Sequence, residues 1–213
     1  RFTLFNLRRM LMNKSFIIKI ILLCLVTIKV SAIEKVILFG DSLMAGYGLP
    51  NEQHLSVVLQ RSLEFDGHNI KIINGSVSGS TSAGGLNIAE WTLSENNIDL
   101  MILCLGANDM LRGINPKETK NNLEEIIQIA KNKNIKVIIA GMIAPTSYGF
   151  AYKKSFDKIF SDLSKKHKLQ LIPFLLEGVA QNPKFNLSDG MHPNDQGTII
   201  IGNTLKKAIL ENL

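Results

Sequence analysis

The sequence predicts an α/β domain in which a doubly wound, five-stranded parallel sheet lies between two layers of helices, a three-layer α/β/α arrangement. Short runs rich in Ile, Val and Leu alternate along residues 33–213 with segments whose apolar residues recur at helical spacing. Hydrophobic residues make up 46% of the 213-residue chain and charged residues 20%, which is typical of a globular protein. We therefore expect residues 33–213 to form one domain.

Five short apolar runs are the predicted strands. They are bounded by Gly, Asn or Pro, and such runs favour parallel strands that are buried on both faces. Strands that alternate with helices are joined by right-handed crossovers, which place helices on both sides of the sheet. In chain order the predicted strands are residues 35–40, 70–74, 100–105, 135–140 and 169–173.

Five segments with apolar residues three and four positions apart are the predicted helices. One of them has a clear start, because Asn115 can cap it and Pro116 takes the first helical position. In chain order the predicted helices are residues 54–63, 86–93, 116–132, 152–166 and 196–210.

Residues 1–32 have the features of a secretory signal peptide. Lys14 and Lys19 precede the short apolar run 20–28, and Val30-Ser31-Ala32 ends the segment with a cleavage site. The run is shorter than the ~20 apolar residues that span a bilayer. We expect cleavage after Ala32, no stable membrane insertion afterwards, and export to the periplasm or, alternatively, secretion. An uncleaved membrane anchor is the other interpretation of this segment.

The net charge of +6 belongs entirely to this leader. Its six basic residues are accompanied by no acidic residue, so residues 33–213 carry no net charge. A neutral domain does not favour nucleic acid or an anionic membrane surface as a partner. Cys104 is the only cysteine beyond the leader and lies in an apolar strand, so we expect a buried thiol and no internal disulfide.

Polar residues follow the predicted strands, where open parallel sheets bind their ligands. Ser42, after the first strand, is a candidate nucleophile that needs a base to take its proton. His192 is the candidate base, and Asp189, three residues earlier, can orient its imidazole. Taken singly, the segment after the first strand favours a helix cap at Ser42 or Asp41 over a nucleophile, and the other two residues fit a solvated turn. The remaining histidines lack such a carboxylate and are expected to be solvated; they are His54, His68 and His167.

Gly79 and Asn108 follow the second and third strands and are candidate donors to an oxyanion. A tetrahedral intermediate carries negative charge, which N–H groups held in place stabilise. Glycine permits close approach of the backbone, and asparagine offers an amide N–H without net charge. Each residue also fits a purely structural role, Gly79 in turn geometry and Asn108 in capping its own loop.

Four segments, taken together and in this order, resemble the marker blocks of the SGNH, or GDSL, hydrolase family. They are Phe39-Gly-Asp-Ser-Leu43, Ser78-Gly-Ser-Thr81, Gly106-Ala-Asn-Asp109 and Asp189-Gly-Met-His192-Pro193. The resemblance runs from about residue 33 to the C-terminus. Residues 106–113, 148–149 and 171–174 are similar to the branch of periplasmic arylesterases, acyl-CoA thioesterases and lysophospholipases. Ser80 is a departure, because close relatives often have Asp there.

The resemblance implies a serine hydrolase of carboxylic esters or thioesters that needs no metal or cofactor. It implies a flavodoxin-like sheet order, with the second, first and third strands side by side. Ser42 would be the nucleophile, and His192 and Asp189 would complete the triad. The oxyanion hole would consist of the N–H groups of Ser42 and Gly79 and the side chain of Asn108. The implied partner is a small-molecule acyl ester or thioester, and we expect a monomer.

Apolar residues beside the strand-end loops either line a groove for an acyl chain or form core beneath the loops. They are Met110, Leu111, Ile143, Phe150, Phe174 and Leu175.

Other functions share parts of this pattern. A carbohydrate O-deacetylase of the same superfamily would have identical motifs and a different pocket. A non-catalytic, flavodoxin-like module could hold a phosphate on residues 76–85, which are rich in Ser, Thr and Gly. That interpretation leaves Asp189 and His192 without a role. The sequence contains no G-x-S-x-G, which argues against an α/β-hydrolase with a nucleophile elbow.

Overall fold

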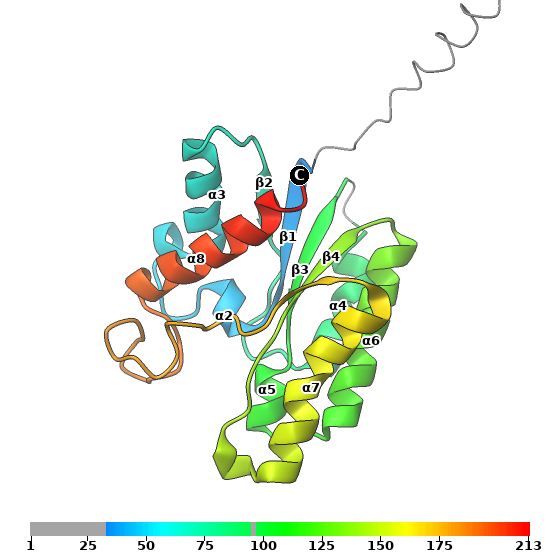
Figure 1. The fold of residues 1–213 in the computed structure, drawn as a ribbon. Helices are drawn as coiled ribbons and strands as arrows, with labels where there is room; N and C mark the ends of the chain where they lie inside the picture. Colours follow the sequence, from blue (N-terminus) through cyan, green and yellow to red (C-terminus); the bar gives the residue numbers. More distant parts are fainter. Residues whose placement is uncertain (1–32, 95–96) are drawn as a thin grey trace, which may run out of the picture. The chain divides into compact units, whose positions relative to one another are not determined.

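Five parallel strands in the order β2-β1-β3-β4-β5 form the sheet of the computed structural model, which describes residues 33–94 and 97–213 (Figure 1). Both the parallel sheet and the flavodoxin-like order are confirmed, and every predicted strand is present with ends shifted by at most one residue. The strands are β1 (Lys35–Gly40), β2 (Lys71–Asn74), β3 (Leu100–Cys104), β4 (Lys136–Ala140) and β5 (Gln170–Ile172).

The centre of the sheet is the centre of the core. All of β3 is buried and only Lys35 of β1 is not, because both strands have neighbours on each side and helices on each face. The expectation of burial on both faces is wrong for β2, where Lys71 and Asn74 are exposed at the edge of the sheet. Cys104 is buried as predicted, and burial raises the pKa of its thiol.

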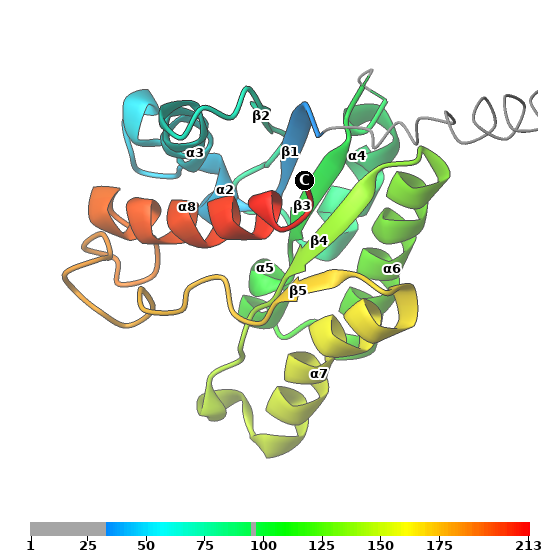
Figure 2. The ribbon, with the colours of Figure 1, turned by 45° about the horizontal axis from the view of Figure 1, so that its top comes forward.

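Helices cover the two faces of the sheet, as Figures 1 and 2 show from two directions. On one face α3 (Leu55–Phe65) packs against α8 (Asp195–Leu210). On the other face α6 (Pro116–Asn132) lies between α4 (Ser82–Thr92) and α7 (Phe150–His167). All five predicted helices are therefore confirmed.

The start of α4 differs from the prediction for a local reason. Helix α4 begins at Ser82, because the Thr81 hydroxyl accepts from Gly84 N–H at 3.1 Å and caps it. Its first turn holds two glycines and shows no apolar pattern, so periodicity missed it. By contrast, α6 begins at Pro116 as predicted, and its cap Asn115 accepts from Lys117 N–H.

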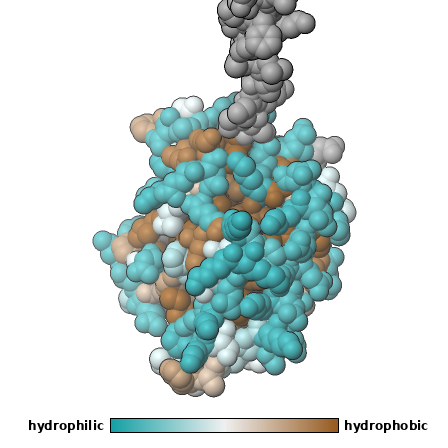
Figure 3. All heavy atoms as spheres, turned by 45° about the vertical axis from the view of Figure 1, so that its right-hand side comes forward, coloured by the Kyte–Doolittle hydropathy of each residue, from teal (hydrophilic) through white to brown (hydrophobic). Residues whose placement is uncertain are grey.

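Short helical turns that periodicity does not reveal follow two central strands. Helix α2 (Ser42–Ala45) comes directly after β1, and α5 (Ala107–Leu111) comes directly after β3. Two 3-10 turns, η1 (Asn51–Gln53) and η2 (Thr146–Tyr148), lie in further connections. Figure 3 shows that the face it presents is mostly hydrophilic, with apolar side chains between the polar ones.

The predicted signal peptide, residues 1–32, lies outside the described residues. Within residues 33–94 and 97–213, no helix has the length and apolar character needed to cross a membrane.

Candidate active site

The turn after β1 presents Ser42 at the carboxyl edge of the sheet. Gly40 pairs with Cys104 of β3 so closely that a Cβ on Gly40 would lie 2.6 Å from the Cys104 carbonyl oxygen. The Asp41 carboxylate then caps α2 by accepting from Leu43 N–H at 3.1 Å. Ser42 is thus the first residue of a helix, and its hydroxyl is half-buried beside the cavity described below.

A tight loop between β5 and α8 presents the candidate base. Asn186 and Pro193 form an antiparallel bridge, and Leu187 N–H donates to the His192 carbonyl at 2.8 Å. Inside this loop the Asp189 carboxylate accepts from the backbone N–H groups of Met191 and His192, at 2.9 and 3.0 Å. The loop therefore folds back on itself and holds Asp189 and His192 together.

Ser42, His192 and Asp189 form one continuous hydrogen-bonded chain. His192 Nε2 lies 2.9 Å from Ser42 Oγ, and His192 Nδ1 lies 2.7 Å from Asp189 Oδ2. An ionised carboxylate has no proton to donate and can only accept, so Nδ1 of His192 is the donor in this pair. Nε2 is then free to accept the Ser42 proton. The structure thus brings together three residues that the sequence separates by up to 150 positions.

The Asp189 carboxylate is held in its ionised form. Backbone hydrogen bonds from His192 and Met191, followed by the contact with the imidazole, lower the pKa of Asp189 to about 2. A negative charge fixed beside Nδ1 stabilises an imidazolium if the ring takes a proton from Ser42.

The two candidate oxyanion donors lie at the same cavity. Gly79, in the loop after β2, has φ +79, which favours glycine, and Arg112 donates to its carbonyl at 3.0 Å. Asn108 lies in α5, and its amide Nδ2 donates to Asp41 Oδ2 at 3.3 Å. One cavity is lined by Ser42, Gly79, Asn108 and His192. These candidate residues therefore lie together, as predicted.

A buried polar network holds the two donor-bearing segments together. Asp109, next to Asn108, accepts from Ser82 N–H at 2.7 Å, from the Ser82 hydroxyl, and from the Thr119 hydroxyl at 3.1 Å. Asn122 in turn donates to the Ser82 hydroxyl at 3.0 Å. These bonds join α5 to the first turns of α4 and α6, which sets the position of Asn108 relative to the loop that carries Gly79.

Asp41 is a second carboxylate at the site, and sequence reasoning missed its role beyond capping. It is fully buried, and desolvation raises its pKa to about 6 despite the hydrogen bonds from Leu43 and Asn108. Its two oxygens accept from the α2 backbone and from the Asn108 amide. Asp41 therefore fixes both the helix of the candidate nucleophile and the orientation of a candidate oxyanion donor.

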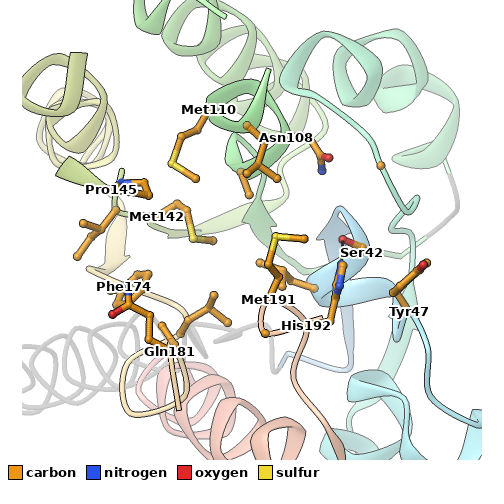
Figure 4. Close-up of a pocket in the computed structure, with 18 of the residues that line it drawn as sticks. Ser42, Tyr47, Asn108, Met110, Met142, Pro145, Phe174, Gln181, Met191 and His192 are labelled. Carbon is orange, nitrogen blue, oxygen red and sulfur yellow. Dashed lines mark hydrogen bonds between the residues drawn. The ribbon is translucent and has the colours of Figure 1, made fainter. Parts of the chain in front are cut away.

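The cavity beside Ser42 has a volume of about 550 Å³ and a mostly apolar lining (Figure 4). Four of the predicted pocket residues line it: Met110, Leu111, Ile143 and Phe174. Two do not. Leu175 is 1% exposed and belongs to the core, although its neighbour Phe174 lines the cavity. Phe150 begins α7 and is 81% exposed, outside the cavity lining.

Other lining residues were not predicted, because the sequence gives no sign that they face a cavity. They include Leu43, Tyr47, Met142, Pro145, Gln181 and Met191. Tyr47 is the one with a readable signal, since glycines flank it on both sides directly after the Ser42 block. The expectation of a solvated His167 is wrong: Glu124 on α6 lies 2.8 Å from its Nε2, and the ring is buried between α6 and α7.

Comparisons with known proteins agree with this geometry. Residues 38–198 match the GDSL-like lipase/acylhydrolase family. The chain is 35% identical to an arylesterase of Vibrio mimicus over 85% of this chain and 91% of that protein. It is 30% identical to thioesterase 1/protease 1/lysophospholipase L1 of Escherichia coli K12 over 88% of each chain. The crystal structure of TesA superposes with a TM-score of 0.80 at 32% identity, covering 84% of this chain and all of that one.

Replacing Asp41 with Asn should change how stability depends on pH. The pKa of Asp41 is about 6 in the folded protein and about 3.8 when exposed, so burying its charge costs stability above pH 6 and costs nothing below pH 4. The unfolding free energy of Asp41→Asn relative to wild type should therefore rise by roughly 2–4 kcal/mol between pH 4 and pH 7. Urea unfolding at several pH values measures this difference.

The matched control is Asp99→Asn. Asp99 directly precedes β3, at the amino end of the strands, and its carboxylate accepts from the N–H groups of Glu34 and Lys35. A difference between Asp41→Asn and wild type that stays constant across this pH range would contradict the raised pKa.

Proposed function

Because the chain belongs to the GDSL-like lipase/acylhydrolase family and is an ester or thioester hydrolase of that type, we propose that Ser42, His192 and Asp189 carry out the reaction. The observation that carries the proposal is the unbroken chain from Ser42 Oγ through the imidazole to the Asp189 carboxylate, at 2.9 and 2.7 Å. A hydroxyl becomes nucleophilic when a neighbouring base removes its proton, and this chain supplies that base.

The reaction proceeds in two halves. Ser42 Oγ attacks the acyl carbonyl while His192 Nε2 takes the hydroxyl proton, and the imidazolium then protonates the leaving alcohol or thiol. Water enters, gives a proton to the same nitrogen, and releases the acid from Ser42. In each half the carbonyl oxygen becomes an oxyanion, which the Ser42 and Gly79 N–H groups and the Asn108 amide stabilise.

An acyl chain is the part of the substrate that suits the cavity. Three methionine side chains and an aromatic ring lie on its walls, and methionine adapts to flexible apolar chains; they are Met110, Met142, Met191 and Phe174. The proposed substrate class is therefore a fatty acyl ester or thioester. A carbohydrate O-deacetylase needs room only for an acetyl group and polar groups for a sugar, so chain-length preference separates the two.

We also propose that residues 1–32 direct export and are removed after Ala32, on the strength of their basic start, apolar run and small residues. Expression of the whole chain in a Gram-negative host, followed by intact-mass measurement of the periplasmic and medium fractions, should yield a protein that begins at Ile33. A full-length protein that stays with the membrane fraction would contradict cleavage and support the anchor.

Replacing Ser42 with Ala should abolish turnover. We expect residues 33–213 to hydrolyse p-nitrophenyl esters between acetyl and palmitoyl, and Ser42→Ala to lower kcat by about 10⁴-fold or more because no other group forms the acyl-enzyme. Ser94→Ala, an exposed serine at the end of α4, is the control and should behave like wild type. A folded Ser42→Ala protein with wild-type rates would exclude the proposed nucleophile. An optimum at acetyl would favour the deacetylase.

Activity should rise with pH as the imidazole loses its proton. Asp189, with a pKa of about 2, stays ionised throughout, so on the acid side log kcat/KM should fall by one unit per pH unit. A steeper fall that returns to one unit in Asp41→Asn would assign a second proton to Asp41, whose pKa is about 6. A flat profile down to pH 4 would remove His192 from the role of base.

A further inference from the structure

The aromatic ring of Tyr47 lies against the imidazole of His192. The two ring centroids are 4.5 Å apart and the planes are tilted by 37°. Both residues line the cavity, and Figure 4 shows Tyr47 on the side of His192 that faces away from Phe174 and the opposite wall. The proposed reaction gives this tyrosine no step, although it touches the residue that moves every proton.

Two glycines in left-handed conformations set the position of Tyr47. Gly46 has φ +88 and ends α2, and Gly48 has φ +74. A Cβ on Gly46 would collide with the His54 ring, and one on Gly48 would lie 2.7 Å from Leu187 Cδ1. The turn is therefore packed between His54, at the start of α3, and the loop of the candidate base, and a side chain at either glycine would displace it.

The same turn connects the two halves of the site. Its first residue continues directly from the helix of Ser42, and Gly48 packs against Leu187, whose N–H donates to the His192 carbonyl at 2.8 Å. Ser42 and His192 come from opposite ends of the domain sequence. Tyr47 is thus fixed relative to both the hydroxyl and the imidazole between which a proton must move.

The hydrogen bonds of His192 restrain its ring only at two edges. Asp189 holds Nδ1 and Ser42 holds Nε2, and neither prevents the ring from tilting about the line between those atoms. A side chain packed against one face of the imidazole restricts tilting toward that face. The face of an aromatic ring also attracts a cation, so this contact strengthens when the imidazole becomes an imidazolium. An interaction that is stronger in the transition state than in the ground state accelerates the reaction.

We propose that Tyr47 is a positioning residue for the hydrolysis, one that fixes the tilt of the His192 ring and stabilises its protonated form through the aromatic face. The inference rests on the proposed function, because it concerns the same imidazole. It assigns the effect to the ring and none to the phenolic hydroxyl. The charged groups around the imidazole are Asp189, in direct contact, and Asp41, which lies close enough for its charge to interact with the ring.

Tyr47→Leu, Tyr47→Phe and Phe65→Leu, compared with wild type, test this inference. Phe65 is a 92% exposed aromatic at the end of α3, which controls for the loss of a surface ring. The measurements are kcat and KM on one soluble p-nitrophenyl ester, the pH profile of kcat/KM, and thermal unfolding of each variant. Wild type and Ser42→Ala are measured first, so that an inactive wild type counts against the proposed function and not against Tyr47.

With the wild type active, Tyr47→Leu should lower kcat about threefold to tenfold with little change in KM. Its acid limb should move down by about half a pH unit, because the imidazolium has lost a favourable contact. Tyr47→Phe should recover most of kcat and the wild-type acid limb, and Phe65→Leu should match wild type.

Three results would overturn the inference. One is a folded Tyr47→Leu protein with wild-type kcat and an unmoved acid limb. Another is a Tyr47→Phe protein as slow as Tyr47→Leu, which would place the effect in the hydroxyl. The third is a change confined to KM, which would make Tyr47 a wall of the binding cavity. If Tyr47→Leu does not fold, Tyr47→Trp is compared with wild type instead. Its larger ring keeps the contact with the imidazole, so its acid limb should match that of wild type, and a different acid limb would overturn the inference.

Discussion

The parallel pairing of β1 with β3 is the contact on which the rest of the molecule depends. These two strands are almost entirely buried, and Gly40 allows the end of β1 to approach the Cys104 carbonyl more closely than any side chain would permit. Because both strands end at this point, the residues that follow β1 and the residues that follow β3 lie side by side. Ser42 and Asn108 owe their proximity to that register, and the hydrogen bonds that Asp41 and Asp109 accept then fix their orientations.

Burying polar groups around the site costs folding stability, but their hydrogen bonds fix the positions of the site residues. Asp41 and Asp109 are both fully buried, and carboxylates in such places are tolerated only when donors surround them. Asp109 accepts from three donors on two elements, whereas Asp41 accepts from two donors. The site thus contains two buried carboxylates, and Asp41, which has fewer donors, is the one next to Ser42.

Sequence reasoning recovered what periodicity and residue order encode, and it failed where the third dimension decides. The apolar runs located every strand, but only the pairing shows that β2, with Lys71 and Asn74 exposed, lies at an edge of the sheet. Ser42, Gly79 and Asn108 could be named because the topology places strand ends together, and the pair Asp189 and His192 because a carboxylate three residues before an imidazole can contact it. Phe174 and Leu175 are adjacent and both apolar, so the sequence could not show that only Phe174 lines the cavity. His167 is buried because α6 brings Glu124 against it, and the residues next to His167 in the sequence give no indication of this contact.

The separation of Ser42 and His192 by 150 residues has a consequence during synthesis. Ser42, the proposed nucleophile, leaves the ribosome near the beginning of residues 33–213, whereas His192, its proposed base, emerges 150 residues later, just before α8. A growing polypeptide therefore contains Ser42 without the imidazole contact until the segment that precedes α8 has been made. Under the proposed mechanism, a product terminated before His192 would lack the base that activates the serine.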